Sequence, residues 1–167
     1  MRSYESKIVS LDQMKAIRAQ MKAEGKKLVF TNGCFDILHI GHANYLAFAR
    51  QLGNALLVAI NSDSSVRRLK GYPRPIVKQE DRARMLAAME AVDYVTIFDE
   101  DTPEKLLKEL LPDFLVKGQD WSHNVVGREI VEQAGGKVVL APLTDGRSTS
   151  RIVEHILSSY SGGNENK

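Results

Sequence analysis

The chain has little cysteine, no long apolar run and no excess of charge of either sign, and each absence excludes a class of protein. Its one cysteine, Cys34, excludes an intramolecular disulfide, and a four-ligand Cys/His zinc cluster of the usual kinds cannot be assembled around it. No apolar run approaches the length of a transmembrane helix, and the first residues lack the apolar core of a signal peptide. The 23 basic and 21 acidic residues give a net charge of +2, too balanced to indicate a nucleic-acid or membrane surface. We therefore expect a cytoplasmic protein with no nucleic-acid or membrane partner.

Segments of strand type and helix type alternate along the 167 residues, and a 43% hydrophobic content suits a single domain with a sizeable core. The alternation predicts an α/β fold, Rossmann-like and doubly wound, around a mostly parallel five-stranded sheet. The expected strands are 27–31, 55–60, 94–98, 114–116 and 137–140. The expected helices are 11–24, 41–52, 62–69, 79–89, 103–111, 124–134 and 149–159. Residues 1–26 are expected to form a helical segment before the domain of residues 27–160, and residues 161–167 a disordered tail.

Two histidines follow the first predicted strand and open the helix after it. His39 and His42 stand three residues apart, so on a helix their side chains share a face. At a helix start they lie beside unpaired backbone N–H groups and the positive end of the helix dipole, which suits a polyphosphate. The alternative is a pair of packed or solvated histidines, with Gly41 easing a turn. Zinc is disfavoured, since the helical zinc motif spaces its histidines four apart with a glutamate between them.

Polar clusters follow four of the predicted strands, at residues 33–42, 61–63, 117–121 and 145–151. In an open parallel sheet, ligands bind outside the carboxyl ends of the strands, where the strand order reverses. We therefore expect the four clusters to meet along one edge of the sheet and to form a single site.

The last cluster has the composition of a second phosphate site. Ser148, Thr149 and Ser150 are strong N-cap types, so one of them is expected to open the final helix. Arg147 and Arg151 stand on either side, and guanidinium groups bind phosphate oxygens through forked, charge-assisted hydrogen bonds. The alternative is an ordinary capped helix with two solvated arginines.

The segment 67–74 is basic, and Gly71, Pro73 and Pro75 interrupt its helical pattern. We interpret it as a mobile loop beside the second predicted strand. A solvated surface and a nucleic-acid patch are the alternatives. The acidic residues 99–101 are expected to cap the helix predicted at 103–111, with Thr102 as the N-cap and acidic charge favoured at that helix end.

Three blocks of sequence resemble the cytidylyltransferase-like nucleotidyltransferases in composition and order. They are Gly-Cys-Phe-Asp-x-x-His-x-Gly-His at residues 33–42, Lys-Gly-x-Asp-Trp at 117–121 and Gly-Arg-Ser-Thr-Ser at 146–150. Within that superfamily, Glu80-Asp81-Arg82 and residues 98–103 resemble the adenylyltransferases of ADP-heptose synthesis. The resemblance runs from about residue 27 to residue 155.

The resemblance implies a nucleotidyltransferase domain in residues 27–160 that takes ATP and D-glycero-β-D-manno-heptose 1-phosphate as substrates. The products are ADP-D-glycero-β-D-manno-heptose and pyrophosphate, formed by direct in-line attack on the α-phosphate, with Mg²⁺ as cofactor. Such enzymes are commonly homo-oligomers, and lipopolysaccharide core synthesis is the implied pathway.

The resemblance also implies the residues of the site. Catalytic roles fall on His39, His42, Lys70 and Arg151, and the resemblance implies that the basic segment holding Lys70 closes over the phosphates. The acceptor is placed beside Asn61, Asp63 and Arg74, and the metal beside Asp36. Nucleotide contacts fall on Asn32, Gly33, Cys34, Phe35, Asp36, Gly41, Lys117, Gly118, Asp120, Trp121, Arg147, Ser148, Thr149 and Ser150.

Two other functions are compatible with these residues. The Asp120-Trp121 pair also resembles the glycerol-phosphate cytidylyltransferases, which makes CTP with glycerol 3-phosphate, or a similar alcohol, an alternative pair of substrates. A nucleotide-binding module without turnover is the alternative of another class, because a fold does not fix a function. Nucleotidyl transfer needs positioning and positive charge rather than a covalent nucleophile, so Cys34 is interpreted as a packing residue.

Overall fold

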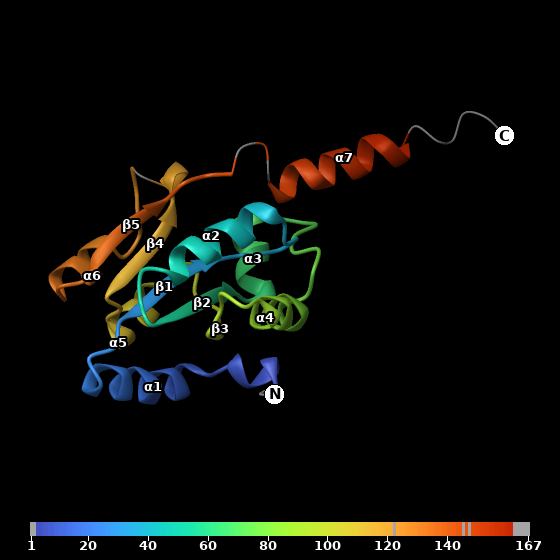
Figure 1. Cartoon of the computed structure of the whole chain (residues 1–167). Coiled ribbons are helices and arrows are strands. Elements are labelled where there is room, and N and C mark those ends of the chain that lie inside the picture. Colours follow the sequence, from blue (N-terminus) through green and yellow to red (C-terminus); the bar gives the residue numbers. More distant parts are fainter. Residues whose placement is uncertain (1–2, 122, 145, 147, 162–167) are drawn as a thin grey trace.

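A computed structural model describes residues 3–121, 123–144, 146 and 148–161, with the backbone alone at Trp121. Its centre is a sheet of five parallel strands in the order β3-β2-β1-β4-β5 (Figure 1). The strands are β1 Leu28–Gly33, β2 Ala55–Asn61, β3 Tyr94–Phe98, β4 Phe114–Gly118 and β5 Lys137–Ala141. All five predicted strands are confirmed, and the predicted α/β fold with a parallel sheet is correct.

The helices also lie where the alternating pattern places them. They are α1 Leu11–Ala23, α2 Ile40–Arg50, α3 Asp63–Lys70, α4 Gln79–Ala88, α5 Glu104–Leu110, α6 Arg128–Gln133 and α7 Thr149–Ser161. Two short 3-10 helices, η1 Tyr4–Lys7 and η2 Gln119–Trp121, were not among the predicted helices. The helix predicted to start at residue 124 begins instead at residue 128, because Gly127 precedes it with a φ of 88°. Among the described helices, none is both long and apolar enough to cross a membrane.

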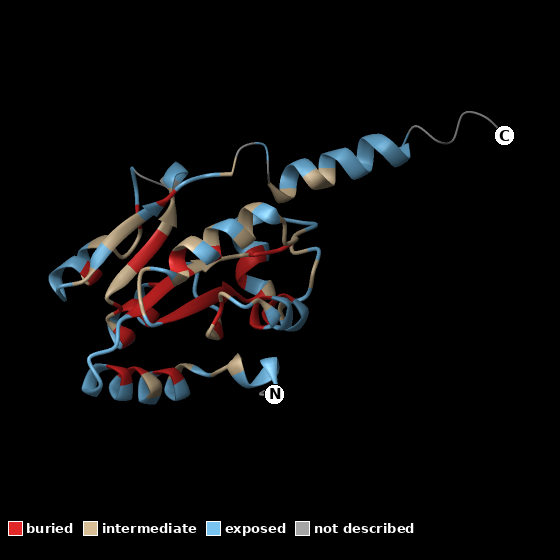
Figure 2. Ribbon diagram, in the orientation of Figure 1, coloured by how far each residue is buried: buried red, intermediate tan, exposed pale blue. Residues whose placement is uncertain are grey.

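Helices cover both faces of the sheet, and the apolar side chains between the layers form two cores. One core joins the sheet to α1, α5 and α6, and the other joins it to α2 and α4. Every residue of β2, the second strand from the β3 edge, is buried, as the red interior of Figure 2 illustrates. Met14 and Met21 of α1 belong to the first core, so the N-terminal helix shares the interior of the sheet domain. By contrast, α7 projects from the body and none of its residues is buried (Figures 1 and 2).

The strand order reverses between β1 and β4, and these two strands separate toward their carboxyl ends. β1 pairs with β2 along its whole length but with β4 only at Val29 and Phe30. The hydroxyl of Tyr45 on α2 bridges the gap, since it donates to the Val116 carbonyl at 2.8 Å and lies 2.6 Å from the Thr31 hydroxyl. A crevice at such a switch point is the usual ligand site of an open α/β sheet.

The Tyr45 bridge yields a stability prediction. Replacement of Tyr45 by phenylalanine is expected to lower the free energy of unfolding by about 1–2 kcal/mol, because the Val116 carbonyl and the Thr31 hydroxyl lose a buried partner. Urea unfolding followed by circular dichroism measures the change. Tyr160→Phe is the matched control, because Tyr160 is 83% exposed on α7. Equal stability of both variants would contradict the structural role of the bridge.

Candidate active site

The loop after β1 brings the two predicted histidines into contact at the start of α2. His39 is the N-cap of α2, and its Nδ1 accepts a hydrogen bond from the Gly41 N–H at 3.1 Å. That bond places a lone pair on Nδ1, so the His39 ring proton in this arrangement lies on Nε2 when the ring is neutral. The rings of His39 and His42 stack with their centroids 3.9 Å apart. The predicted pairing of the histidines at a helix N-terminus is therefore present.

His42 carries the feature that points most directly to a ligand. Its Nδ1 is buried without a hydrogen-bond partner, and no other buried side-chain nitrogen or oxygen among the described residues is in this state. Burial, followed by repulsion from His39, lowers the pKa of His42 to about 4. His42 is therefore neutral at pH 7 in the free protein. A phosphate group beside it would supply both a hydrogen-bond partner and a negative charge that favours the protonated ring.

Binding of a triphosphate is consequently expected to be coupled to proton uptake. An adjacent anion raises a histidine pKa by about 1–3 units, which brings the pKa of His42 in the complex to about 5–7, so ATP binding should protonate His42 and tighten as the pH falls from 7 to 5. Calorimetric titrations in two buffers of different ionisation enthalpy measure the protons taken up. The control is His42→Asn, which cannot take up the proton. The same uptake in both proteins would contradict the assignment.

Asp36 holds the basic loop, residues 71–77 between α3 and the N-cap of α4, against the phosphate loop, residues 34–39 between β1 and α2. Its buried carboxylate accepts hydrogen bonds from Arg74 Nη1 at 2.8 Å and from the backbone N–H groups of Ile76 and Val77, each at 2.9 Å. Burial acts to raise the pKa of Asp36, but the Val77 and Arg74 hydrogen bonds outweigh it and lower the pKa below its usual value. Arg74, predicted beside the acceptor, is thus the ion-pair partner of Asp36.

These contacts bear on the predicted magnesium ion. Mg²⁺ prefers carboxylate and phosphate oxygens together with water, and here both Asp36 oxygens already accept bonds from three donors. Among residues 3–121, 123–144, 146 and 148–161, no three His, Cys, Asp or Glu side chains gather into a possible metal site. Asp36 is therefore a loop anchor in this structure, and its predicted contact with a Mg²⁺ ion that substrate phosphates would also hold stays a prediction.

Lys117 reaches across the gap between β4 and β1. Its Nζ donates to the Asn32 side-chain oxygen at 2.6 Å and lies 3.4 Å from the Asn32 carbonyl. Burial lowers the pKa of Lys117 to about 8, although Asp120 and Cys34 act to raise it. Burial also raises the pKa of the Cys34 thiol, which supports its interpretation as a packing residue. The site therefore contains a desolvated ammonium beside the phosphate loop.

The predicted acceptor residues follow β2 at the same edge. The buried Asn61 amide donates to Ser65 Oγ at 3.0 Å, and Asp63 opens α3 and pairs with Arg82 at 2.7 Å. Both side chains are therefore engaged within the protein. Lys70 is the last residue of α3, where the basic loop starts.

The start of α7 meets the histidine loop. Ser148 Oγ accepts the Arg151 N–H at 3.2 Å, which confirms that one of the three hydroxyl residues caps this helix. Thr149 Oγ1 donates to the Ile37 carbonyl at 3.1 Å, two residues before His39. The two predicted phosphate sites are thus adjacent. Arg147 and the Trp121 side chain, both predicted to contact the nucleotide, lie outside the described residues.

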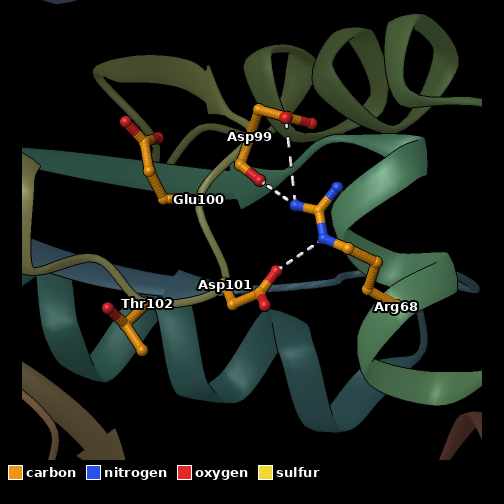
Figure 3. A pocket seen from close by; sticks show the side chains of 5 residues that line it. All are labelled: Arg68, Asp99, Glu100, Asp101 and Thr102. Carbon is orange, nitrogen blue, oxygen red and sulfur yellow. Dashed lines mark hydrogen bonds and ion pairs between the residues drawn. The ribbon is translucent and has the colours of Figure 1, made fainter.

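A separate surface pocket beside β3 shows where one prediction was wrong. It is lined by Arg68, Asp99, Glu100, Asp101 and Thr102 (Figure 3). Thr102 was predicted to be the N-cap of α5, with the acidic residues before it, but the N-cap is Pro103, without a side-chain bond. Asp99 instead accepts bonds from the Ser62 and Ser64 hydroxyls, and Arg68 joins Asp99 to Asp101. These acids fasten α3 to the end of β3, and no predicted site residue lines the pocket.

Comparison with known proteins identifies the family. A family model described as cytidylyltransferase-like matches residues 30–155, most of the chain. The chain belongs to the cytidylyltransferase-like family. The predicted resemblance is confirmed, and so, at the level of the family, is the prediction of a nucleotidyltransferase enzyme.

Two relatives of this cytidylyltransferase-like chain, from Citrifermentans bemidjiense and Geobacter sulfurreducens, are both named bifunctional protein HldE. They are 57% and 53% identical to it over 157 residues, 93% of the chain. The chain spans only 32% of the length of each relative.

Solved structures share the fold. A lipopolysaccharide core biosynthesis protein from Thermoplasma volcanium is 26% identical, with a TM-score of 0.59, over 72% of this chain and 98% of that one. A pantoate-beta-alanine ligase from Francisella tularensis, solved with an ATP derivative and beta-alanine, is 16% identical with a TM-score of 0.61. That alignment covers 86% of this chain and 68% of the ligase, and it shows the fold alone.

Proposed function

We propose that this cytidylyltransferase-like domain transfers the adenylyl group of ATP to D-glycero-β-D-manno-heptose 1-phosphate and releases pyrophosphate. The observation that carries the proposal is the unsatisfied Nδ1 of His42, located where two helix N-termini meet at the end of β1. The names of the relatives and the heptose-type blocks at residues 80–82 and 98–103 support this sugar phosphate.

The protein contributes to this reaction by positioning the two substrates and by placing positive charge around the phosphates. The sugar phosphate is itself an anionic nucleophile, so its oxygen attacks the α-phosphorus in line while pyrophosphate leaves, and no protein nucleophile is needed. Negative charge builds on the phosphoryl oxygens, and donors already fixed around them stabilise the transition state without reorganisation. Burial lowers the pKa of both His42 and Lys117, and these two residues supply a potential and an actual positive charge beside the phosphate loop. Arg151 and Lys70 are exposed at its rim.

The alternative substrates are CTP with glycerol 3-phosphate, on the basis of the Asp120-Trp121 pair. In this structure a Cβ at Gly118 would overlap the Asp120 carboxylate, whose exposed side chain would have to move aside in the close turn at the end of β4. This turn is compatible with both candidate pairs of substrates and does not discriminate between them. We propose ATP because two blocks, residues 80–82 and 98–103, are of the heptose type, whereas only the Asp120-Trp121 pair resembles the glycerol-phosphate cytidylyltransferases. A homo-oligomer, a cytoplasmic location and an Mg²⁺ requirement belong to the same proposal.

A substrate panel tests the proposal. Pyrophosphate release is measured with ATP, CTP, GTP or UTP, each with heptose 1-phosphate of either anomer or glycerol 3-phosphate, in the presence and absence of Mg²⁺. Release is expected with ATP and the β-anomer of heptose 1-phosphate. Release with CTP and glycerol 3-phosphate would transfer the function to the alternative, and nucleotide binding without release on the whole panel would favour a binding module.

A further inference from the structure

Arg82 on α4 is a buried guanidinium that bonds to three segments of the candidate site: the phosphate loop, the end of β2 with the start of α3, and the basic loop. Its side chain has no exposed surface. Nε donates to the Val77 carbonyl at 3.0 Å, and Nη1 donates to the carbonyls of Cys34 and Asn61 at 2.6 and 2.9 Å. Nη2 donates to the Asp63 carboxylate at 2.7 Å. No role described so far uses this residue.

The partners of Arg82 come from the two halves of the proposed reaction. Cys34 lies in the loop that leads to the histidine pair, where ATP is proposed to bind. Asn61 and Asp63 begin the segment proposed to lie beside the acceptor. Val77 ends the basic loop, and its N–H donates to Asp36 while its carbonyl accepts from Arg82. The guanidinium therefore fixes the spacing between the nucleotide side, the acceptor side and the basic loop.

The geometry requires arginine in particular. A planar guanidinium presents donors in fixed directions, whereas a lysine ammonium at the end of a flexible stem cannot reach four acceptors spread around a plane. Burying such a charge is costly unless every donor is paired, and an apolar residue would have filled the same space at less cost. What distinguishes Arg82 is that all four of its acceptors belong to segments of the candidate site.

A second buried arginine provides the matched control, and its partners lie before β4, at the amino-terminal ends of the strands. Arg18 on α1 is 5% exposed, donates to the carbonyls of Leu110 and Leu111 at 3.1 and 2.8 Å, and pairs with Asp113 at 3.0 Å. Like Arg82, it joins backbone carbonyls and a carboxylate of separate loops. Unlike Arg82, it contacts no loop of the candidate site.

We propose that Arg82 is a positioning residue, which holds the nucleotide and acceptor loops at the separation that in-line attack requires; this inference rests on the proposed adenylyl transfer. Small errors in the placement of two bound reactants cost turnover far more than binding, because each substrate still finds its own contacts. A loosened Arg82 should therefore lower kcat with little change in the affinity for either substrate alone.

The test compares Arg82→Lys with Arg18→Lys in the full chain. Both variants should lose thermal stability to a similar extent, because each loses buried hydrogen bonds. Arg82→Lys is expected to lower kcat for pyrophosphate release by about 100-fold, with Kd for ATP and for the sugar phosphate within about threefold of the wild type. Arg18→Lys is expected to keep kcat within about twofold when assayed well below its unfolding temperature.

Equal kcat for the two lysine variants at equal stability would overturn the positioning role. A parallel loss of ATP affinity and kcat in Arg82→Lys would also overturn it, because Arg82 would then serve binding. If Arg82→Lys does not fold, Arg82→Gln and Arg18→Gln replace the pair with the same expectations. If the wild type shows no turnover on the whole substrate panel, the proposed function itself is contradicted. If the wild type turns over and the Arg82 and Arg18 variants have equal kcat, only the positioning role is contradicted.

Discussion

Replacement of His42 by alanine is expected to lower kcat by about 10²- to 10³-fold, while Kd for ATP changes by less than about fivefold. The reason is the state of the ring in the free protein. Its pKa of about 4 keeps it neutral, and its Nδ1 has no partner until a phosphate arrives. The imidazole therefore gains most when negative charge builds on the transferring group, and a group that acts mainly there affects turnover more than binding.

The measurement for His42→Ala pairs steady-state pyrophosphate release with calorimetric binding of ATP. His155→Ala is the control, because His155 is exposed on α7 away from the stacked pair, and its kcat should equal that of the wild type. Equal losses of kcat and of affinity in His42→Ala would contradict transition-state stabilisation and leave the histidine as a binding residue.

Replacement of Lys117 by methionine is expected to lower kcat/KM by about 100-fold or more. Methionine keeps the approximate length of the side chain and removes the charge. Inside the protein that charge acts in a medium of low dielectric, where a phosphate a few ångströms away is worth several times what it would be in water. The ammonium also holds Asn32 in place through its 2.6 Å bond. Both losses weaken the phosphate loop.

The pH profile separates the two contributions of Lys117. Because the pKa of Lys117 in the free protein is about 8, the charged form that binds phosphate is lost as the pH rises through 8, and kcat/KM of the wild type should fall there. Lys117→Met should show a low kcat/KM without this fall. Lys137→Met on β5 is the control, since that side chain is exposed. An unchanged alkaline limb in Lys117→Met would assign the limb to another group.

Sequence patterns predicted the fold well because the elements are encoded locally. The apolar run of β2 is buried at every position, and the apolar positions of α1 and α4 face the sheet. The errors have local causes as well. Gly127 adopts a positive φ before α6 and shortens that helix, and Asp99 finds hydroxyl and guanidinium donors on α3 instead of the end of α5. Neither the backbone conformation of Gly127 nor the partners of Asp99 can be predicted from residue spacing along the chain.

The location of the candidate site was predictable from the sequence, but the hydrogen bonds and ion pairs within it were not. Motifs after the strands placed His39, His42 and Lys117 at one edge, since parallel strands carry their carboxyl ends together. The ion pair of Asp36 with Arg74 joins residues 38 apart, and the bond of Lys117 to Asn32 joins residues 85 apart. Arg82 was missed as a functional residue, although a charge within the apolar pattern of α4 was a visible signal.

The most direct test follows the phosphate of the acceptor. The chain is mixed with Mg²⁺, ATP and β-heptose 1-phosphate whose phosphate oxygens carry ¹⁸O, and the products are weighed by mass spectrometry. Adenylyl transfer by direct attack predicts an ADP-heptose that keeps the label in its sugar-side phosphate, together with unlabelled pyrophosphate. Label in the pyrophosphate, or the absence of an ADP-heptose, would contradict the proposed reaction.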